Sequence, residues 1–273
     1  VDEYYDRAKP YRTFPRMEKP TPKDPAIEYM KSRSISKEIC EKYHITVSKD
    51  SDNILVFLFY DNKDDLIFIK YRKTDYDPEK DKNKEWCFTG AKPILFGMDQ
   101  CNIENKTLIM TEGQIDSLSV EEVGFENAVS VPTGKNGFTW VPYCWDWLQN
   151  FDTLIIFGDK EGDNITLLDD MASRFNGLVK HVRLEDYKDC KDANDILRKY
   201  GAEQVKTCIN NAVPVEIKEI KDILDVKKVN LADLEKFNTG IQKLNKIIGG
   251  FYMGQVILMT GEKGKGKSTL VSQ

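Results

Sequence analysis

Carboxylates follow two strand-like segments of this chain. Glu112 ends the run TLIMTEG, Asp159 ends the run TLIIFGD, and Glu161 lies two residues further on. The carboxyl ends of parallel strands meet at one edge of a sheet, so acids from two strand ends can converge on one site. Converging carboxylates suit a hard cation such as Mg²⁺, with waters and substrate phosphates as further ligands. Solvated loop acids are the alternative interpretation of each residue taken singly.

A phosphate-binding pattern lies in GEKGKGKST. Gly261, Gly266, Lys267 and Ser268 satisfy G-x-x-x-x-G-K-[ST], and Thr269 follows them. Backbone N–H groups of such a loop cradle phosphates, Lys267 reaches the β and γ oxygens, and Ser268 ligates Mg²⁺. The preceding QVILMT is a predicted strand. Because the chain stops four residues later, we expect an incomplete NTPase domain that binds ATP in the full-length protein and no ATP hydrolysis by this chain.

The segments around the two acids alternate between strand and helix patterns. The predicted strands are TLIMTEG, AVSVPTG, TLIIFGD and HVRLE, and the predicted helices are QIDSLSVEEVG, CWDWLQNF and ITLLDDMASRFNG. Alternation of this kind is typical of a parallel sheet with helices packed on it. The sequence therefore predicts an α/β fold in which the acids share one edge.

The first hundred residues have a different pattern. Two short helices are predicted from Pro25, and ILVFLFYD and LIFIKYRK form a predicted hairpin around DNKDD. Lys70 and Arg72 lie two apart on the second strand, so both point to one face and could contact phosphates. A solvated strand face with alternating charge is the alternative. The charged residues 74–84 are predicted to be an exposed loop, and residues 1–25 to be an extended tether.

Composition limits the class of protein. The 273 residues have room for about two domains, and 40% hydrophobic with 31% charged residues is typical of a soluble globular protein. A net charge of -5 gives no global basic field, so nucleic-acid binding must depend on local patches. The six cysteines are scattered without zinc or redox spacing, and no apolar run could span a membrane. We expect reduced thiols, no membrane partner and a cytoplasmic location, in a bacterial cytosol or a phage-infected cell.

Three motifs in order carry a family resemblance. TLIMTEGQIDSLSV, TLIIFGDKEGD and KDANDIL resemble the TOPRIM fold of bacterial and phage primases, type IA and type II topoisomerases and some nucleases. The upstream YMKSRSISKEICEKYHI, KYR and GAKPILFG resemble the amino-terminal half of a primase catalytic domain. The downstream FNTGIQKLNKIIGGFYMGQVILMTGEKGKGKST resembles the start of a ring-helicase motor. Together they resemble a phage-type bifunctional primase-helicase, the family that includes mitochondrial Twinkle.

The resemblance implies roles for four acids. It places the family's catalytic glutamate on Glu112 and the first aspartate of its Asp-x-Asp pair on Asp159. The second aspartate falls on Glu161, which keeps a carboxylate but is one methylene longer. Asp163 is a substitute ligand. The resemblance thus implies that these acids hold Mg²⁺ or Mn²⁺.

The resemblance also implies contacts with nucleotide or DNA. Asp192 and Asn194 of KDANDIL match an element that lies beside the acidic site, although a helix N-cap explains Asp192 nearly as well. Lys70, Arg72 and Lys92 lie in the primase-like part and are the expected cationic contacts.

The expected organisation has five parts. They are an arm over 1–25, an α+β primase subdomain over 26–104, a TOPRIM domain over 105–212, a linker helix over 213–237, and the start of a RecA-like helicase domain over 238–273. In the family, the corresponding linker helix docks on a neighbouring subunit of the ring, and packing on its own domain is the alternative. The fold class expected is therefore an α/β TOPRIM sheet with a small α+β subdomain and a truncated P-loop segment.

The activity that the resemblance implies is metal-dependent synthesis of short RNA primers from nucleoside triphosphates on single-stranded DNA. A catalytically silent TOPRIM domain that binds single-stranded DNA and supports a ring helicase is the main alternative, and a TOPRIM nuclease is a third. The implied partners are replication proteins such as a DNA polymerase, and the full-length protein is expected to form a ring oligomer.

Overall fold

A computed structural model describes most of the chain: residues 11–134, 137–215, 234–258 and 260–262. The chain divides into two compact units, Val1–Val215 and Glu216–Gln273, which are treated separately below. No helix in the described part of the chain has the length and apolarity needed to cross a membrane.

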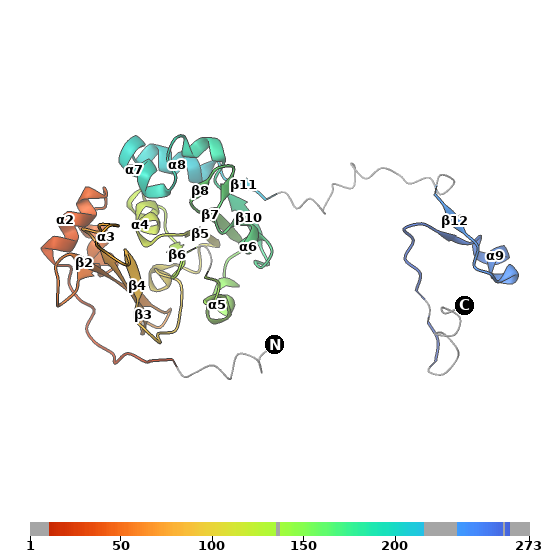
Figure 1. Ribbon diagram of the computed structural model, residues 1–273, viewed down its shortest axis with the longest axis horizontal. Coiled ribbons are helices and arrows are strands. Elements are labelled where there is room, and N and C mark those ends of the chain that lie inside the picture. The colour runs from red at the N-terminus through yellow and green to blue at the C-terminus, as the bar shows by residue number, and fades with distance from the viewer. Residues whose placement is uncertain (1–10, 135–136, 216–233, 259, 263–273) are drawn as a thin grey trace. The chain divides into compact units, whose positions relative to one another are not determined.

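The elements of the first unit are mostly short (Figure 1). Its helices are α2 Asp24–Ser32, α3 Lys37–Lys42, η1 Met98–Gln100, α4 Gln114–Glu122, α5 Val141–Leu148, α6 Leu168–Ala172, η2 Leu184–Tyr187, α7 Ala193–Tyr200 and α8 Ala202–Asn210. Its strands are β1 Thr46–Val47, β2 Ile54–Tyr60, β3 Leu66–Lys73, β4 Glu85–Cys87, β5 Thr107–Thr111, β6 Ala128–Ser130, β7 Thr153–Phe157, β8 Lys160–Glu161, β9 Asn164–Ile165, β10 Leu178–His181 and β11 Val213–Pro214.

The larger sheet has five strands in the order β11-β10-β7-β5-β6. The strands β10, β7, β5 and β6 are parallel, whereas β11 pairs with β10 in the antiparallel direction. The central strands TLIMT and TLIIF are buried after their first residue, as expected for strands covered on both faces. The predicted parallel sheet is confirmed.

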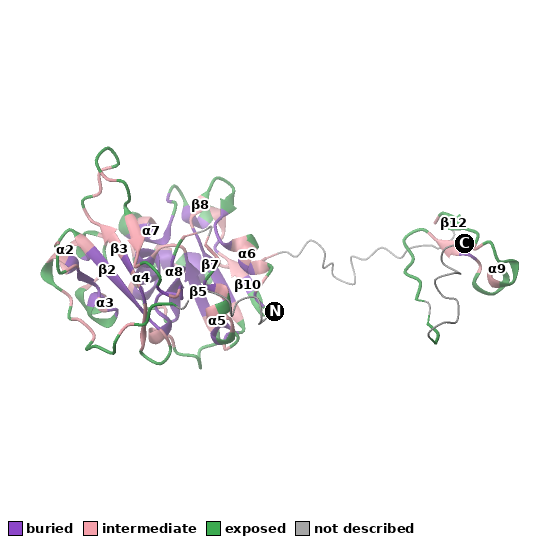
Figure 2. Ribbon diagram, turned by 60° about the horizontal axis from the view of Figure 1, so that its bottom comes forward, coloured by how far each residue is buried: buried purple, intermediate pink, exposed green. Residues whose placement is uncertain are grey.

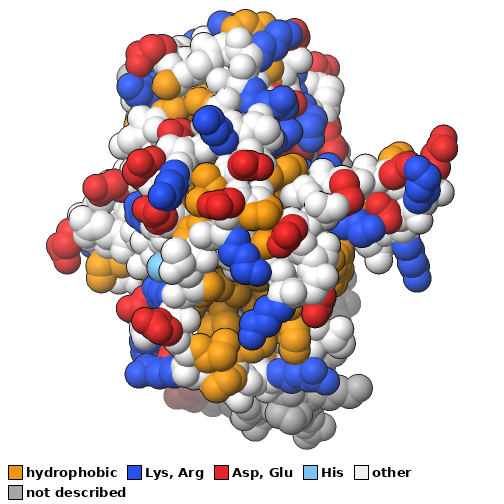
Figure 3. Space-filling model, turned by 90° about the vertical axis from the view of Figure 1, so that its left-hand side faces the viewer, with side chains coloured by type: hydrophobic (Ala, Val, Ile, Leu, Met, Phe, Trp, Pro, Cys, Tyr) orange, Lys and Arg blue, Asp and Glu red, His pale blue; other side chains and the backbone are white. Residues whose placement is uncertain are grey.

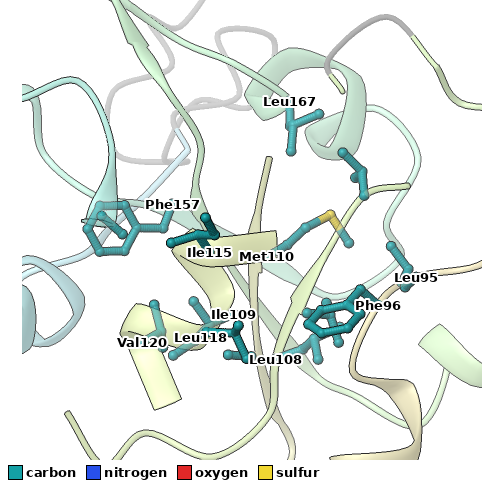
Figure 4. Close-up of a cluster of buried hydrophobic side chains, with 14 of the residues drawn as sticks. Leu95, Phe96, Leu108, Ile109, Met110, Ile115, Leu118, Val120, Phe157 and Leu167 are labelled. Atoms are coloured by element: carbon teal, nitrogen blue, oxygen red, sulfur yellow. The ribbon is translucent and has the colours of Figure 1, made fainter. Parts of the chain in front are cut away.

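The core of this unit lies between the sheet and its helices. Figure 4 shows apolar side chains of β5, including Leu108 and Met110, with Ile115 and Leu118 of α4 and Phe157 of β7. Leu108, Met110 and Leu118 have no exposed surface. Helix α4 packs against β5, β6 and α7. Burial on this scale fixes the start of α4 relative to the end of β5, which is where the predicted site lies.

The smaller sheet is antiparallel, in the order β1-β2-β3-β4, and confirms the predicted hairpin. Its strand β2 is buried on both faces (Figure 2). Leu55, Phe57 and Phe59 join the main core, whereas Val56 and Leu58 belong to a second apolar cluster on the other face. The two helices predicted before the hairpin are α2 and α3.

Residues 11–23 precede α2 and lie against the smaller sheet. The backbone N–H of Arg12 donates to the Gly90 carbonyl over 2.8 Å, and the Phe14 and Phe88 rings meet edge to face with centroids 5.2 Å apart. A free tether has no such contacts, so the tether interpretation is wrong for the described part of the arm.

Two predicted elements after β7 differ in extent. Helix α6 has five residues, fewer than ITLLDDMASRFNG predicted, and strand β10 begins three residues before HVRLE. The backbone at Gly177 explains the early strand, because a Cβ there would lie 2.3 Å from the Asp152 carbonyl oxygen. This close approach brings Leu178 directly beside β7, and pairing with β7 decides where the strand starts.

The second unit contains β12 Lys236–Phe237, α9 Gln242–Ile248 and β13 Phe251–Tyr252 in its described part. The strand predicted over 255–260 is not found at residues 255–258, where Val256 and Leu258 are about nine-tenths exposed. No described strand pairs with this run, and a strand without a partner leaves its ladder unmade. Most of the predicted linker helix, 216–233, lies outside the described residues, while Val213–Pro214 at its start is strand β11.

Candidate active site

A cavity of about 590 Å³ lies between the smaller sheet and the carboxyl ends of β5 and β7. Eleven charged residues line it: the acids Glu85, Glu112, Asp116, Asp159, Asp192 and Asp195, and the cations Arg33, Lys70, Arg72, Lys84 and Lys191. The acids other than Glu85 come from the larger sheet and its helices. The cations other than Lys191 come from the first hundred residues.

A larger cavity of about 1030 Å³ lies on the opposite, outer face of the smaller sheet. Its floor is apolar and includes Val56, Leu58 and Ile69. Figure 3 views the molecule from the side of α2 and the smaller sheet, where hydrophobic side chains gather between charged ones. The acids of this larger cavity are Glu18, Asp50 and Asp64. Within the described part of the chain, the close grouping of carboxylates that could hold a metal ion lies in the smaller cavity.

Three aspartates form the centre of the acidic wall. Asp116, Asp159 and Asp192 each have a carboxylate oxygen within 4.8 Å of the others. Asp116 lies in α4, Asp159 follows β7, and Asp192 precedes α7. Asp159 and Asp192 were predicted from the sequence as site residues, and Asp116 was not.

Asp116 is held by its neighbours in α4 and α7. Its Oδ1 accepts a hydrogen bond from the backbone N–H of Asn194 over 3.0 Å. A Cβ added at Gly113 would lie only 2.5 Å from Asp116 Oδ2. Gly113 is the N-cap residue of α4, and its lack of a side chain leaves room for the carboxylate. The turn from β5 into α4 therefore positions this acid.

Asp159 is placed by the tight turn after β7. Its backbone N–H donates to Thr166 Oγ1 over 2.8 Å. Gly158 packs against Thr166 so closely that a Cβ added at Gly158 would lie 2.1 Å from the Thr166 carbonyl oxygen. The Gly158 carbonyl also accepts a hydrogen bond from the buried hydroxyl of Tyr187. These contacts fix the backbone from which the Asp159 carboxylate projects.

Asp192 has two roles, one for each oxygen. Its Oδ1 accepts from the Asp195 N–H over 2.7 Å and caps α7, which confirms the helix-cap interpretation. Its Oδ2 lies 3.1 Å from the ammonium group of Lys191, which also lies 3.5 Å from Asp159 Oδ2. Capping therefore leaves an oxygen of Asp192 facing the cluster.

Burial and like charge disfavour ionisation of this cluster. Burial raises the pKa of Asp116 well above its ordinary value, and the charges of Asp192 and Asp159 raise it further. Burial, with the charge of Glu112, raises the pKa of Asp159 to about 6 despite the opposing effect of Lys191. Such a cluster is stabilised by a cation that neutralises it.

Glu112 lines the same cavity at the end of β5. A Cβ added at Gly134 would lie 3.4 Å from Glu112 Oε1. The backbone of Gly134 has a φ of +74°, which glycine adopts without strain. Glu161 and Asp163 are in a different place. Both are exposed in the β8–β9 hairpin and neither lines the cavity.

The cationic wall begins with the predicted pair on β3. Lys70 Nζ lies 2.7 Å from Glu85 Oε2, and Arg72 Nη1 lies 2.6 Å from Glu85 Oε1. Lys70 is only 6% exposed, so the interpretation of this strand face as solvated is wrong. Arg33, at the end of α2, and Lys84, just before β4, add two more cations to this wall.

Two other predicted contacts lie outside the cavity. Asn194 is buried, and its Nδ2 donates to the Arg33 carbonyl and to Ser119 Oγ, which ties α7 to α2 and α4. The ammonium of Lys92 lies 4.8 Å from the centre of the Tyr143 ring, in a separate cavity. The structure thus brings together Lys70, Arg72 and Asp192 but not these two.

The phosphate-binding pattern near the end of the chain is mostly beyond the described residues. Gly261 is described and has no regular secondary structure. Gly266, Lys267, Ser268 and Thr269 lie outside the described part.

Six charged residues of the cavity were not predicted as site residues: Arg33, Lys84, Glu85, Asp116, Lys191 and Asp195. A signal existed for Asp116, because it stands four residues after Glu112, in the first turn of the helix that follows the strand. Lys191 precedes the named Asp192. No local pattern separates Arg33 from the other cations of its segment.

Sequence comparison finds similar proteins, although no family model matches the chain. The chain is 27% identical over 214 residues to a primase homolog protein of Arabidopsis thaliana, and 26% identical over 275 residues to the chloroplastic/mitochondrial Twinkle homolog protein of the same plant. It is 25% identical over 253 residues to a DNA helicase/primase of Enterobacteria phage T3. The matches cover 71%, 90% and 89% of this chain.

The chain spans only part of each relative: 61% of the primase homolog, 37% of the Twinkle homolog and 43% of the phage protein. The expected resemblance to phage-type primase-helicases is nevertheless confirmed by these similarities.

Solved structures show the same fold. The Aquifex aeolicus primase aligns with a TM-score of 0.55 at 17% identity, covering 71% of this chain and 57% of that one. A chain from the complex of phage T7 lagging-strand DNA polymerase with primase domains aligns with a TM-score of 0.54 at 23% identity, covering 68% and 91%. The DnaG primase catalytic domain bound to single-stranded DNA aligns with a TM-score of 0.51 at 16% identity. The alignment covers 70% of this chain and 72% of that one. The first unit therefore has the TOPRIM-type primase fold.

Proposed function

We propose that this chain is the primase part of a replicative primase-helicase, which synthesises short RNA primers on single-stranded DNA. One observation carries the proposal: a single cavity has a wall of clustered carboxylates and a facing wall of cations. Nucleotidyl transfer needs both, because a metal must be held at one side of the reacting phosphate and the remaining phosphate charge must be neutralised at the other. The similarity to primases supports this assignment.

The acidic wall fits a divalent cation. Asp116, Asp159 and Asp192 offer oxygen donors within 4.8 Å of one another. Burial and the charge of Glu112 raise the pKa of Asp159, and a bound cation would offset both effects. Hard oxygen donors suit Mg²⁺ or Mn²⁺. When bound, such an ion polarises the reacting phosphate and lowers the pKa of the attacking hydroxyl.

The residues of the chain then have separate tasks. The three aspartates hold the ion, and Glu112 adds a carboxylate at the end of β5. Lys70 and Arg72 bind and orient phosphate oxygens from the opposite wall, where Arg's planar donors and Lys's ammonium suit charged oxygens. Glu161 and Asp163 are assigned no contact with the reacting phosphate.

A catalytically silent TOPRIM domain is the second candidate. The observation in its favour is Lys191, whose ammonium already lies between two of the proposed metal ligands. In this case the cationic wall would bind single-stranded DNA for a ring helicase without any chemistry.

Primer synthesis separates the two candidates. Labelled ribonucleotides, mixed-sequence single-stranded DNA and Mg²⁺ or Mn²⁺ are incubated with the protein and with its Glu112→Ala and Asp159→Ala variants. A primase gives short metal-dependent products that both variants lose, while an exposed control, Glu126→Ala, keeps them. If the protein binds the DNA but none of the reactions yields product, the silent domain is the better description.

Partners are proposed by analogy with the solved complexes. The structural relatives include a primase catalytic domain bound to single-stranded DNA and primase domains interacting with a DNA polymerase. We assign single-stranded DNA, nucleoside triphosphates and a DNA polymerase to this chain as partners. ATP at the P-loop and a ring oligomer stay predictions for the full-length protein.

A further inference from the structure

We propose that Glu85 acts as an internal anion that pairs with Lys70 and Arg72 and is displaced by the phosphates of an incoming nucleotide. Glu85 is thus a positioning residue for the cation pair. This inference rests on the proposed function, because it takes the cation pair to be the phosphate-binding part of the site.

The geometry of the three side chains resembles phosphate binding. Each carboxylate oxygen of Glu85 meets one cation, at 2.7 Å from Lys70 and 2.6 Å from Arg72. Strand pairing sets this up, since Glu85 on β4 lies directly opposite Arg72 on β3, and Lys70 is two residues away on the same face. A phosphate group likewise offers two charged oxygens to two cations.

Exposure shows which partner can leave. The Glu85 side chain is 30% exposed, against 8% for Lys70 and 17% for Arg72. Glu85 also begins β4, a three-residue strand at the edge of its sheet. The carboxylate can therefore turn toward water while the buried stems of the two cations stay in the wall.

The cations keep binding capacity for a larger anion. Arg72 Nε is buried and has no hydrogen-bond partner among the described residues. Among the described residues, this wall of the cavity has four cations and one acid, Glu85. Burial lowers the pKa of Lys84, and the nearby charges of Arg72 and Lys191 lower it further, which shows crowded positive charge. One carboxylate therefore leaves the wall short of negative charge.

Pairing with Glu85 keeps Lys70 and Arg72 from pairing with the acidic wall before a nucleotide binds. Lys70 and Arg72 face a cavity whose opposite wall carries the three clustered aspartates. Ion pairs across the cavity would occupy the oxygens needed for the metal. Because Glu85 pairs with both cations on their own wall, the aspartates stay available.

Replacement of Glu85 by Gln tests the idea. The amide has nearly the same shape but no charge, so a nucleotide no longer competes with a carboxylate for the cation pair. We expect ATP and tripolyphosphate to bind about threefold to tenfold more tightly. In primer synthesis the change is expected mainly in KM for the nucleotide, with a smaller change in kcat.

A thermal shift provides a readout that does not need catalysis. Without ligand, Glu85→Gln is expected to lower Tm, because Lys70 loses its buried partner. Tripolyphosphate should then raise Tm more in the variant than in the unchanged protein. Glu85→Asp keeps the charge on a shorter side chain and should give intermediate affinity. Glu79→Gln, an exposed change of the same charge in the nearby loop, should leave binding unchanged.

The outcomes separate this inference from the proposed function. If Glu85→Gln binds tripolyphosphate as weakly as, or more weakly than, the unchanged protein while Lys70→Gln weakens binding, the pair binds phosphate but Glu85 is only structural. If Lys70→Gln does not weaken binding at all, the phosphate site itself is misplaced and the proposed function loses its cationic wall. Tighter binding by Glu85→Gln, with weaker binding by Lys70→Gln, supports both.

Discussion

The two walls of the cavity differ in how their clustered like charges are neutralised. On the cationic wall, Glu85 pairs with both Lys70 and Arg72 at hydrogen-bonding distance. On the acidic wall, three aspartates lie together with Lys191 as their neighbouring cation, and the Lys191 side chain is 63% exposed. The positive charge of the cationic wall is thus neutralised by a residue of the same wall, whereas the negative charge of the acidic wall depends on a bound cation.

The difference indicates an order of events. The acidic wall gains most from a metal ion, because its carboxylates are buried and repel one another. The cationic wall gains less from phosphate, because it must first release Glu85. Metal binding should therefore be favourable in the absence of nucleotide, whereas nucleotide binding should be weak in the absence of metal.

The largest expected effect comes from removing a central ligand of the acidic wall. Asp116→Asn keeps the acceptor for the Asn194 N–H but loses the charge, so metal-dependent primer synthesis should fall on the order of 100-fold or more. The matched change Asp163→Asn, at an exposed residue outside the cavity, should cost less than about threefold. Equal losses would contradict the structural placement and favour the sequence expectation for Asp163.

A steric change should weaken the same wall without altering its charge. Gly113 has an ordinary negative φ, so Gly113→Ala is allowed by the backbone, but its Cβ would lie 2.5 Å from Asp116 Oδ2. Displacing the carboxylate should lower Mn²⁺ affinity about tenfold. Calorimetric titration with Mn²⁺ measures it, and an unchanged dissociation constant would mean that Asp116 is not a ligand.

The pH dependence of stability tests whether the acidic wall is short of positive charge. The pKa of Asp159 is raised to about 6, so between about pH 4 and pH 6 the folded protein holds a proton that the unfolded chain has lost. Without metal, stability should therefore fall as the pH rises through this range.

Asp159→Asn removes the part of this dependence that Asp159 contributes. In a chelator, the variant should be more stable than the unchanged protein by about 1–3 kcal/mol at pH 7, and the gain should vanish below about pH 4. Urea unfolding at several pH values measures it. A gain of the same size at every pH would assign the effect to packing.

The smallest expected effect concerns the cation of the acidic wall. Lys191→Gln removes an ammonium that competes with the metal for Asp159 and Asp192, so Mn²⁺ should bind about twofold to fivefold more tightly. The effect is small because Lys191 is largely exposed. Weaker Mn²⁺ binding by the variant would show that Lys191 helps to place the ligands.

Local pattern was enough for the main elements. Apolar runs such as TLIIF predict strands that are buried on both faces, and their alternation with helices predicts a parallel sheet. The hairpin was predicted for the same reason. The start of β10 was not predicted, because it depends on the close approach of Gly177 to Asp152, a contact between segments distant in sequence.

The sequence by itself determined which acids follow strands, and it placed Glu112 and Asp159 at one edge of the sheet because side chains after parallel strands share that edge. Only the tertiary structure decided which other residues join the site. Asp116 joins because α4 packs against α7, whereas the hairpin after Asp159 leaves Glu161 outside. The pairing of Glu85 with Arg72 depends on strand register across a charged loop. Packing and register are long-range properties, so no local pattern contains them.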